Sequence, residues 1–165
     1  MPSSVSKITP ADQDPHSEEQ SQQIRTKKKT FRSKSSIHEC REIARRAVSF
    51  LQMFTTDRQI LFDLELIITE ACTNVVFHGY NNDHNGYIEM HLFVENDNNL
   101  VIKIVDGGKP FTGPGQEDFT LDPTMESGRG VYIISQLSDS YSYEHLDGQN
   151  ILRIEKKLRS GAGSA

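Results

Sequence analysis

The stretch LELIITEACTNVVFHG, residues 64–79, decides how the rest of this 165-residue chain is arranged. Its apolar residues recur at the spacing of a helix, about 100° per residue, and predict one long, mostly apolar helix. They form a single broad sector: Leu64, Ile67, Ile68, Ala71 and Val75. Two polar residues four positions apart, Glu70 and Asn74, lie on the flank of that sector. Polar groups at the edge of a buried face are costly without partners, so this pair either lines a polar ligand or borders solvent.

Composition narrows the class of protein. The chain is 35% hydrophobic and 25% charged, as expected for one globular domain, and its net charge of -5 argues against a direct nucleic-acid binder. No apolar run approaches the roughly 20 residues of a membrane helix, and the N-terminal residues lack the apolar core of a signal peptide. We therefore expect a cytoplasmic protein without membrane contact. Cys40 and Cys72 lie in predicted helices without a CxxC motif, which predicts buried, reduced thiols and neither a disulfide nor a cysteine metal site.

The two ends of the chain differ in composition from its middle. Residues 1–24 are rich in Ser, Gln, Pro, Asp and Glu. Such a segment buries too little apolar surface to offset its ordering entropy. We expect a disordered tail over residues 1–27, one domain over 28–158 and a flexible end over 159–165. A passive tail is favoured over a regulatory one.

Arg25 to Lys34, RTKKKTFRSK, carries six basic residues and no acidic one. Two interpretations are open. The stretch contacts an acidic partner or nucleic acid, or it is a solvated edge strand with Phe31 pointing inward and lysines protecting the edge. We favour the edge strand.

The remaining pattern predicts helices and antiparallel strands. A capping box at Ser36–Glu39 opens a helix that ends near Thr55, and a second capping box at Thr56–Gln59 opens the long helix, which Gly79 ends. Further segments are read as strands over 87–95, 100–105, 140–146 and 150–158, and as a helix over 130–137. The strands pair as two hairpins, the second turning at Asp147-Gly148. This order predicts an α/β two-layer sandwich, a mixed, mainly antiparallel sheet covered by helices on one face.

Three local motifs are candidates for chemistry, and the first is Glu70 with Asn74. A glutamate beside a bound phosphate can take a proton from an attacking hydroxyl or water. An asparagine oxygen can bind Mg²⁺, which prefers oxygen ligands and phosphates. Taken alone, the pair fits a solvated helix edge better.

The second motif is VDGGKPF, residues 105–111, directly after a predicted strand. The carboxylate of Asp106 can accept a hydrogen bond from the exocyclic amine of a purine. Glycines beside it allow a flat base to approach the backbone closely. By itself the string fits a simple Asp-Gly turn.

The third motif is ESGRGVYII, residues 126–134, in which Gly-x-Gly opens a helix. Free amides and the positive end of the helix dipole suit an anion such as a phosphate chain, and Arg129 can add a charge-assisted contact. A hinge or an ordinary helix start would give the same string. The long Gly- and Pro-rich loop before it, residues 106–127, is typical of a lid or binding loop.

Together, the strings E-x-x-x-N, D-x-G-x-P-F and G-x-G resemble the N, G1 and G2 boxes of the GHKL ATPases, which include gyrase, Hsp90, histidine kinases and MutL. The compact length and the phrases ITEACTNVVFHGY, VDGGKPF and SGRGVYIISQLSDSYSYE resemble one branch, the anti-sigma factor serine kinases of the RsbW type. The likeness runs from about Thr30 to Leu158. It implies the Bergerat fold of histidine-kinase-like ATPases.

The resemblance also implies roles for individual residues. Asn74 would bind Mg²⁺ and the nucleotide, and Glu70 would be the general base. Asp106 would bind the adenine amine, with Gly108 beneath the base. The phosphates would be covered by Gly128, Arg129 and Gly130, and residues 111–127 would be the ATP lid. His78 is either a catalytic residue or a histidine in the last helical turn.

By the same resemblance, the chain is expected to be an ATP- and Mg²⁺-dependent protein serine/threonine kinase and an anti-sigma factor. It would phosphorylate a STAS-type anti-anti-sigma protein and, as a homodimer, sequester a sigma factor, so that partner switching regulates transcription. One alternative is an ATP-binding switch module that sequesters a partner without phosphorylating it. Another, a fragment of a larger ATPase, is disfavoured because all three boxes occur without a transducer domain.

Overall fold

The computed structural model describes residues 23–111 and 128–159. Most of the expected tails, residues 1–27 and 159–165, and of the expected lid, residues 111–127, lies outside the described residues. Thr26 and Lys27, expected in the tail, belong to the first strand. The elements follow in the order β1 Thr26–Lys34, α1 Ile37–Leu51, α2 Arg58–Asn74, the π-helical turn η1 Val75–Gly79, β2 Tyr87–Glu95, β3 Asn99–Asp106, α3 Arg129–Leu137, β4 Ser140–Leu146 and β5 Gln149–Lys157.

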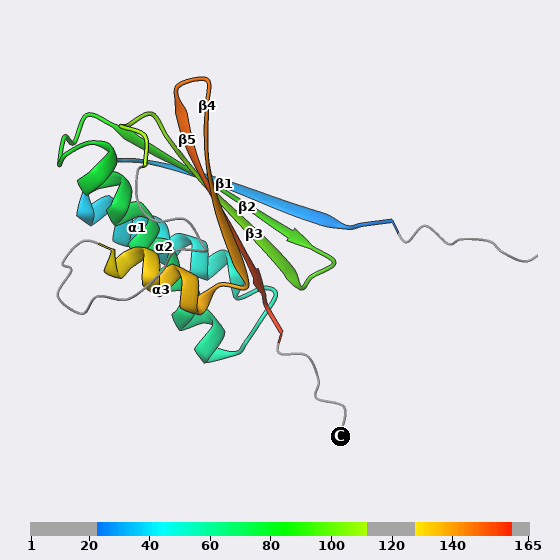
Figure 1. Ribbon diagram of the computed structural model, residues 1–165. Coiled ribbons are helices and arrows are strands. Elements are labelled where there is room, and N and C mark those ends of the chain that lie inside the picture. Colours follow the sequence, from blue (N-terminus) through cyan, green and yellow to red (C-terminus); the bar gives the residue numbers. More distant parts are fainter. Residues whose placement is uncertain (1–22, 112–127, 160–165) are drawn as a thin grey trace, which may run out of the picture.

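These elements form two layers, with α1, α2 and α3 together on one face of the sheet (Figure 1). The sheet has five strands in the order β1-β2-β3-β5-β4. All four strand pairs are antiparallel, so the described sheet is antiparallel throughout rather than mixed. Both predicted hairpins are confirmed, and β3 pairs with β5 to join them into one sheet. The expected two-layer α/β fold is confirmed.

The core lies between the helices and the sheet. The predicted apolar sector, now divided between α2 and η1, faces it, with its five residues 0–9% exposed: Leu64, Ile67, Ile68, Ala71 and Val75. Every second residue of β2 is buried, as its alternating pattern predicted. Cys40 and Cys72 are both buried and free. Phe31 is 4% exposed on β1, which is the first strand of the sheet order, so the edge strand is confirmed.

Helix starts follow local hydrogen bonding. Ser36 caps α1 as predicted, with its side chain accepting from the Glu39 N–H. The cap of α2 is Asp57 rather than Thr56, because the Asp57 carboxylate accepts from both the Gln59 and Ile60 amides. A carboxylate is also favoured beside the positive end of a helix dipole.

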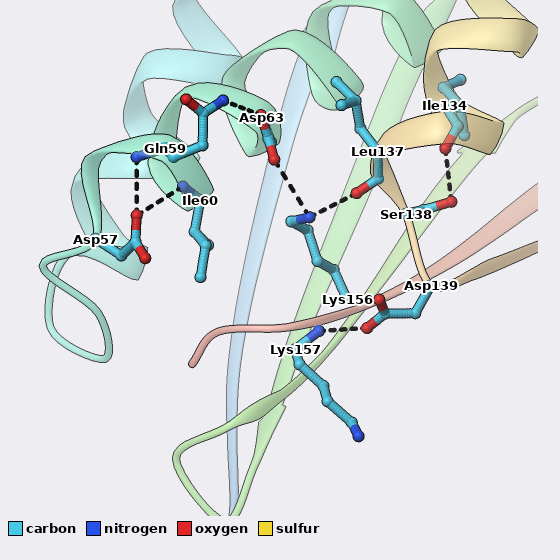
Figure 2. A network of polar contacts seen from close by, with 10 residues as sticks. All are labelled: Asp57, Gln59, Ile60, Asp63, Ile134, Leu137, Ser138, Asp139, Lys156 and Lys157. Atoms are coloured by element: carbon cyan, nitrogen blue, oxygen red, sulfur yellow. Dashed lines mark hydrogen bonds and ion pairs between the residues drawn. The ribbon is translucent and has the colours of Figure 1, made fainter. Parts of the chain in front are cut away.

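The C-terminal end of α3 is fixed to both layers by Lys156 of β5 (Figure 2). The Lys156 Nζ donates to the Leu137 carbonyl at 2.6 Å and lies 3.5 Å from the Asp63 Oδ2 of α2. Gln59 holds the other oxygen of Asp63, at 2.8 Å. These contacts set where α3 lies along α2.

Candidate functional site

A pocket lies between the C-terminal half of α2 with η1 and the facing ends of β3, β4 and β5, and it opens to solvent. Its enclosed part is small, about 30 Å³. Its lining contains two of the sequence-predicted site residues, Asn74 and Asp106. The other lining residues are Ala71, Val75, His78, Gly79, Lys109, Phe111, Tyr143, Asn150 and Leu152. The first two motifs, separated by two strands in the sequence, therefore meet at one pocket.

Asp106 ends β3 and is 5% exposed. Its Oδ1 accepts from the Gly108 N–H at 2.8 Å and from the Asn150 Nδ2 at 2.9 Å. Within the described part of the chain, no hydrogen bond reaches its second oxygen. Because a carboxylate has several acceptor positions, Asp106 can still accept from a ligand donor in the pocket.

Asn150, on β5, is a site residue that the sequence did not reveal. It lies directly opposite Asp106 in the strand register and is 5% exposed. Its Nδ2 also reaches the Gly108 and Lys109 carbonyls at 3.2 and 3.0 Å. The His145 Nδ1 lies 2.9 Å from its Oδ1, so the amide is held from both sides. Asn150 thus fixes the rotation of the Asp106 carboxylate.

The protonation of Asp106 is set by opposing effects. Burial raises the pKa of Asp106 above the ordinary value of a carboxyl group. The hydrogen bonds from Asn150 and Gly108 and the nearby His145 act in the other direction but do not cancel it. The buried Asp106 carboxylate therefore depends on the hydrogen bonds from Asn150 and Gly108 to favour its ionised form.

Gly108 is required by a close backbone contact. A Cβ at Gly108 would lie 2.6 Å from the carbonyl carbon and oxygen of Gly79. The Lys109 N–H donates to that same carbonyl at 2.8 Å. The loop after β3 therefore rests on the turn η1. Gly79 supports this loop, and Tyr80 rather than Gly79 is the C-terminal cap of the turn.

The third motif meets the first at the start of α3. Gly128 caps α3 in the left-handed region, with φ 112°. A Cβ at Gly130 would lie 2.9 Å from the Glu70 Oε2 and 3.0 Å from the Asn74 Oδ1. Glycine at this position lets the first turn of α3 approach both side chains. Arg129 is exposed beside them.

Asn74 carries a polar atom that needs a partner. Its Nδ2 is buried and makes no hydrogen bond among the described residues. The neighbouring Tyr143 has its pKa raised, chiefly by burial, although the nearby Asn74 amide lowers it in part. A buried amide nitrogen without a hydrogen-bond partner is a group that a bound ligand can satisfy.

The side-chain oxygen of Asn74 is of the kind that Mg²⁺ accepts as a ligand. The described residues contain no group of three or more His, Cys, Asp or Glu that could hold a metal ion. Mg²⁺ is commonly held by one or two protein oxygens together with substrate phosphates. The Asn74 Oδ1, facing the start of α3, is such an oxygen.

Two aromatic residues and His78 complete the wall of the pocket. The rings of Phe111 and Tyr143 stack with their centroids 4.2 Å apart. His78 is exposed in the last turn of η1 and lines the pocket, so both interpretations of it stay open.

With this geometry described, the chain can be compared with known proteins. Residues 34–156 match the sequence profile of the histidine kinase-like ATPase domain. The chain belongs to the histidine kinase-like ATPase family. The expectation drawn from the three boxes is therefore confirmed at the level of the family.

Curated relatives within this family are similar to the chain over about half its length. It is 32% identical to the serine-protein kinase RsbW of Bacillus subtilis (strain 168) over 97 residues, which are 54% of this chain and 60% of that protein. It is 33% identical to RsbW of Bacillus thuringiensis (strain Al Hakam) over 98 residues, with the same coverage. The matched part thus spans less than two thirds of these relatives.

A solved structure agrees with the fold. The RsbU and RsbW domains of Rv1364c from Mycobacterium tuberculosis align with a TM-score of 0.60 at 18% identity, covering 81% of this chain and 33% of that one. At this identity the likeness concerns the fold. Among the described residues of the chain, no helix is long and apolar enough to cross a membrane.

Proposed function

We propose that this ATPase-family chain is a cytoplasmic protein serine/threonine kinase and anti-sigma factor of a partner-switching pathway. It would phosphorylate a STAS-type anti-anti-sigma protein and, as a homodimer, sequester a sigma factor. One observation carries the proposal: Asn74 lies in the same pocket as Asp106, and next to Glu70 and the start of α3. Under this proposal, the Asp106 side of the pocket would recognise the base and the Asn74 side would lie toward the phosphates. The similarity to proteins named serine-protein kinase supports transfer to a protein.

Recognition of adenine would depend on Asp106. Its Oδ1 is occupied by donors from Gly108 and Asn150, so the second oxygen would accept from the exocyclic amine. Gly108 would lie beneath the base. The phosphates would extend toward α3, where the helix N-terminus of Gly128, Arg129 and Gly130 supplies amides, a positive dipole end and an exposed guanidinium.

Transfer would depend on position and charge at the other end of the pocket. Asn74 would hold Mg²⁺ through Oδ1, and the ion would neutralise charge on the phosphates. Glu70 would accept the proton of the attacking serine or threonine hydroxyl. Gly130 keeps both side chains close to the first turn of α3, so the reacting groups would be pre-positioned.

The test uses the full chain, Mg-ATP and its cognate STAS protein. Glu70→Gln should reduce phosphoryl transfer by roughly 100-fold or more, because general-base catalysis typically contributes 10²–10⁴-fold. ATP binding should be retained. Glu65→Gln, on the exposed side of α2, is the matched control and should transfer phosphate normally.

Transfer that is unaffected by Glu70→Gln would contradict the role of Glu70. ATP binding with no transfer by the wild type would identify the alternative, a switch module that holds a partner without phosphorylating it. Sigma-factor capture is checked separately, by co-purification with and without ATP.

A further inference from the structure

The outer edge of β1 is an unusually open strand edge. β1 is the first strand of the sheet and pairs with β2 without interruption over nine residues, from Thr26 opposite Glu95 to Lys34 opposite Tyr87. Among the described strands, none pairs with its other side. It contains no proline, and its register has no bulge. Edge strands are usually shortened, bulged or blocked, because their free N–H and C=O groups otherwise pair with another chain.

What protects this edge is positive charge. β1 carries five basic residues and no acidic one in a chain whose net charge is -5. The strand at the opposite edge, β4, has one glutamate and no lysine or arginine. Lysines on an edge repel basic or identical strands, but they attract an acidic one. The charge on β1 therefore disfavours pairing with basic strands or with a second β1, but not pairing with an acidic strand.

Most of these cations have no counter-ion in the described structure. Lys27 pairs with Asp97 at 3.3 Å. Three others lie over aromatic rings: Lys28 over Phe93 at 5.3 Å, Lys29 over Phe31 at 5.9 Å and Arg32 over Tyr87 at 4.9 Å. Glu89 lies opposite Arg32 in the register, but its Oε1 is directed at the His91 Nε2, at 2.8 Å. Ring contacts position the cations without neutralising them.

We propose that the outer edge of β1 is a docking site for an acidic, extended segment of a partner protein, which adds to the sheet as a further strand. Main-chain hydrogen bonds to the edge would supply affinity. Acidic side chains at alternate positions would face Lys28 and Arg32, which lie on one face of the strand. The site is separate from the nucleotide pocket and does not depend on the proposed kinase activity.

Two features favour a peptide over nucleic acid. The edge offers a continuous ladder of backbone groups, which pairs with another peptide backbone. Binding of single-stranded nucleic acid uses aromatic faces that are free to stack on bases. Here the rings of Phe31, Phe93 and Tyr87 already carry cations on their faces.

The test uses the full chain and a fluorescent peptide as long as β1 that alternates glutamate with threonine. Fluorescence anisotropy should detect binding that weakens with added salt. Hydrogen exchange should slow in residues 26–34 when the peptide is bound and stay unchanged in β4. The same peptide with alternate backbone amides N-methylated keeps its charge but cannot form the ladder, and it should bind at least about tenfold more weakly.

Variants separate this surface from general electrostatics. Lys28→Glu should weaken peptide binding by about fivefold or more, since an exposed attraction is replaced by a repulsion. Lys28→Gln, which removes the charge without reversing it, should give a smaller loss, and it tests the same contact should the reversed residue disturb folding. Arg58→Glu, an equal charge reversal on the exposed first turn of α2, should bind like the wild type.

Several results would overturn the proposal. One is that the N-methylated peptide binds as tightly as the unmodified peptide. Another is that both Lys28→Glu and Lys28→Gln bind the peptide as tightly as the wild type. A third is that the peptide slows hydrogen exchange outside β1. Tighter binding of an oligothymidylate would assign the surface to nucleic acid instead. A chain that dimerises through this edge and excludes the peptide would make a second copy the occupant. Asp106→Asn should leave peptide binding intact, so failure of the nucleotide site is distinguishable.

Discussion

At the scale of single residues, the chemistry of the pocket was partly predictable. Asp106 was recognisable because an acidic residue followed by glycines after a strand is a local pattern. Asn150 was not, because only the pairing of β3 with β5 brings it opposite Asp106. The sequence indicated both strands but not which strands are neighbours. The hydrogen bond that orients Asp106 thus comes from a contact 44 residues away.

Asp106→Asn should lower ATP affinity by roughly 10–100-fold. The Asp106 Oδ1 already accepts from Gly108 and Asn150. An amide has only one oxygen, so its NH₂ must face either those donors or the adenine amine. Isothermal titration with ATP measures the loss. Asp147→Asn, in the exposed turn between β4 and β5, is the control, and equal affinities for the two variants would refute the role of Asp106.

The pH below which ATP affinity is lost should depend on Asn150. Because Oδ1 already accepts from Gly108 and Asn150, a proton on Asp106 would occupy the second oxygen, the one proposed to accept from adenine. ATP affinity should therefore be full above the pKa of Asp106 and be lost as pH falls through it. Burial already raises this pKa, and Asn150 counteracts the shift. Asn150→Ala should therefore move the loss of ATP affinity to higher pH. Affinities measured from acidic to neutral pH test this, with the exposed Asn99→Ala as control; an unchanged midpoint would contradict the link.

The same pKa shift has a consequence for stability. A carboxyl group whose pKa is raised on folding favours the native state when it is protonated. This contribution is present below the ordinary carboxyl pKa and is lost as pH rises through the raised value of Asp106. Ionising Asp106 at higher pH therefore costs stability, because burial disfavours its charged form.

At the scale of helices and strands, the element boundaries that local hydrogen bonds determine were predictable from the sequence. The hairpins and the Ser36 cap follow from patterns within a few residues. The turn η1 does not, because the widened turn and Gly79 are fixed by the loop after β3, which lies in contact with them. A glycine at a helix end is also the usual C-terminal cap, so the sequence alone favoured that simpler role.

Gly108→Ala should separate the loop after β3 from η1. Its Cβ would lie 2.6 Å from backbone atoms of Gly79, which cannot move aside like a side chain. We expect a loss of roughly 1–3 kcal/mol in the free energy of unfolding and weaker ATP binding. Gly107→Ala is a close control, because the atoms nearest to its Cβ would belong to Tyr87 and Tyr80, at the ordinary contact distance of 3.5 Å or more. Urea unfolding compares them, and equal stability of the two variants would contradict the close contact.

At the scale of the whole molecule, the two layers were predictable from periodicity, but the contacts that position one layer on the other were not. Lys156 follows an ordinary strand pattern, and nothing near it in the sequence indicates its partners. They are Leu137 on α3 and Asp63 on α2 (Figure 2). Contacts of this kind depend on how the layers cross, which the sequence pattern does not specify.

Lys156→Met should therefore destabilise the molecule through both helices. It leaves the Asp63 carboxylate, 13% exposed, without its cation, and the Leu137 carbonyl without its donor. The expected loss in the free energy of unfolding is about 1–3 kcal/mol. Lys157→Met should change it by less than about 0.5 kcal/mol, because that side chain is exposed.

The effect of Lys156→Met should also reach the other end of α3. Because there is no room even for a Cβ between Gly130 and the side chains of Glu70 and Asn74, a displaced helix would move the first turn of α3 away from both. Phosphoryl transfer should then fall more than ATP affinity, since Asp106 is held by β3 and β5 rather than by α3. Urea unfolding, ATP titration and transfer assays on the two lysine variants measure these quantities separately. If Lys156→Met lowered ATP affinity and transfer equally, global loosening rather than a displaced α3 would explain the result.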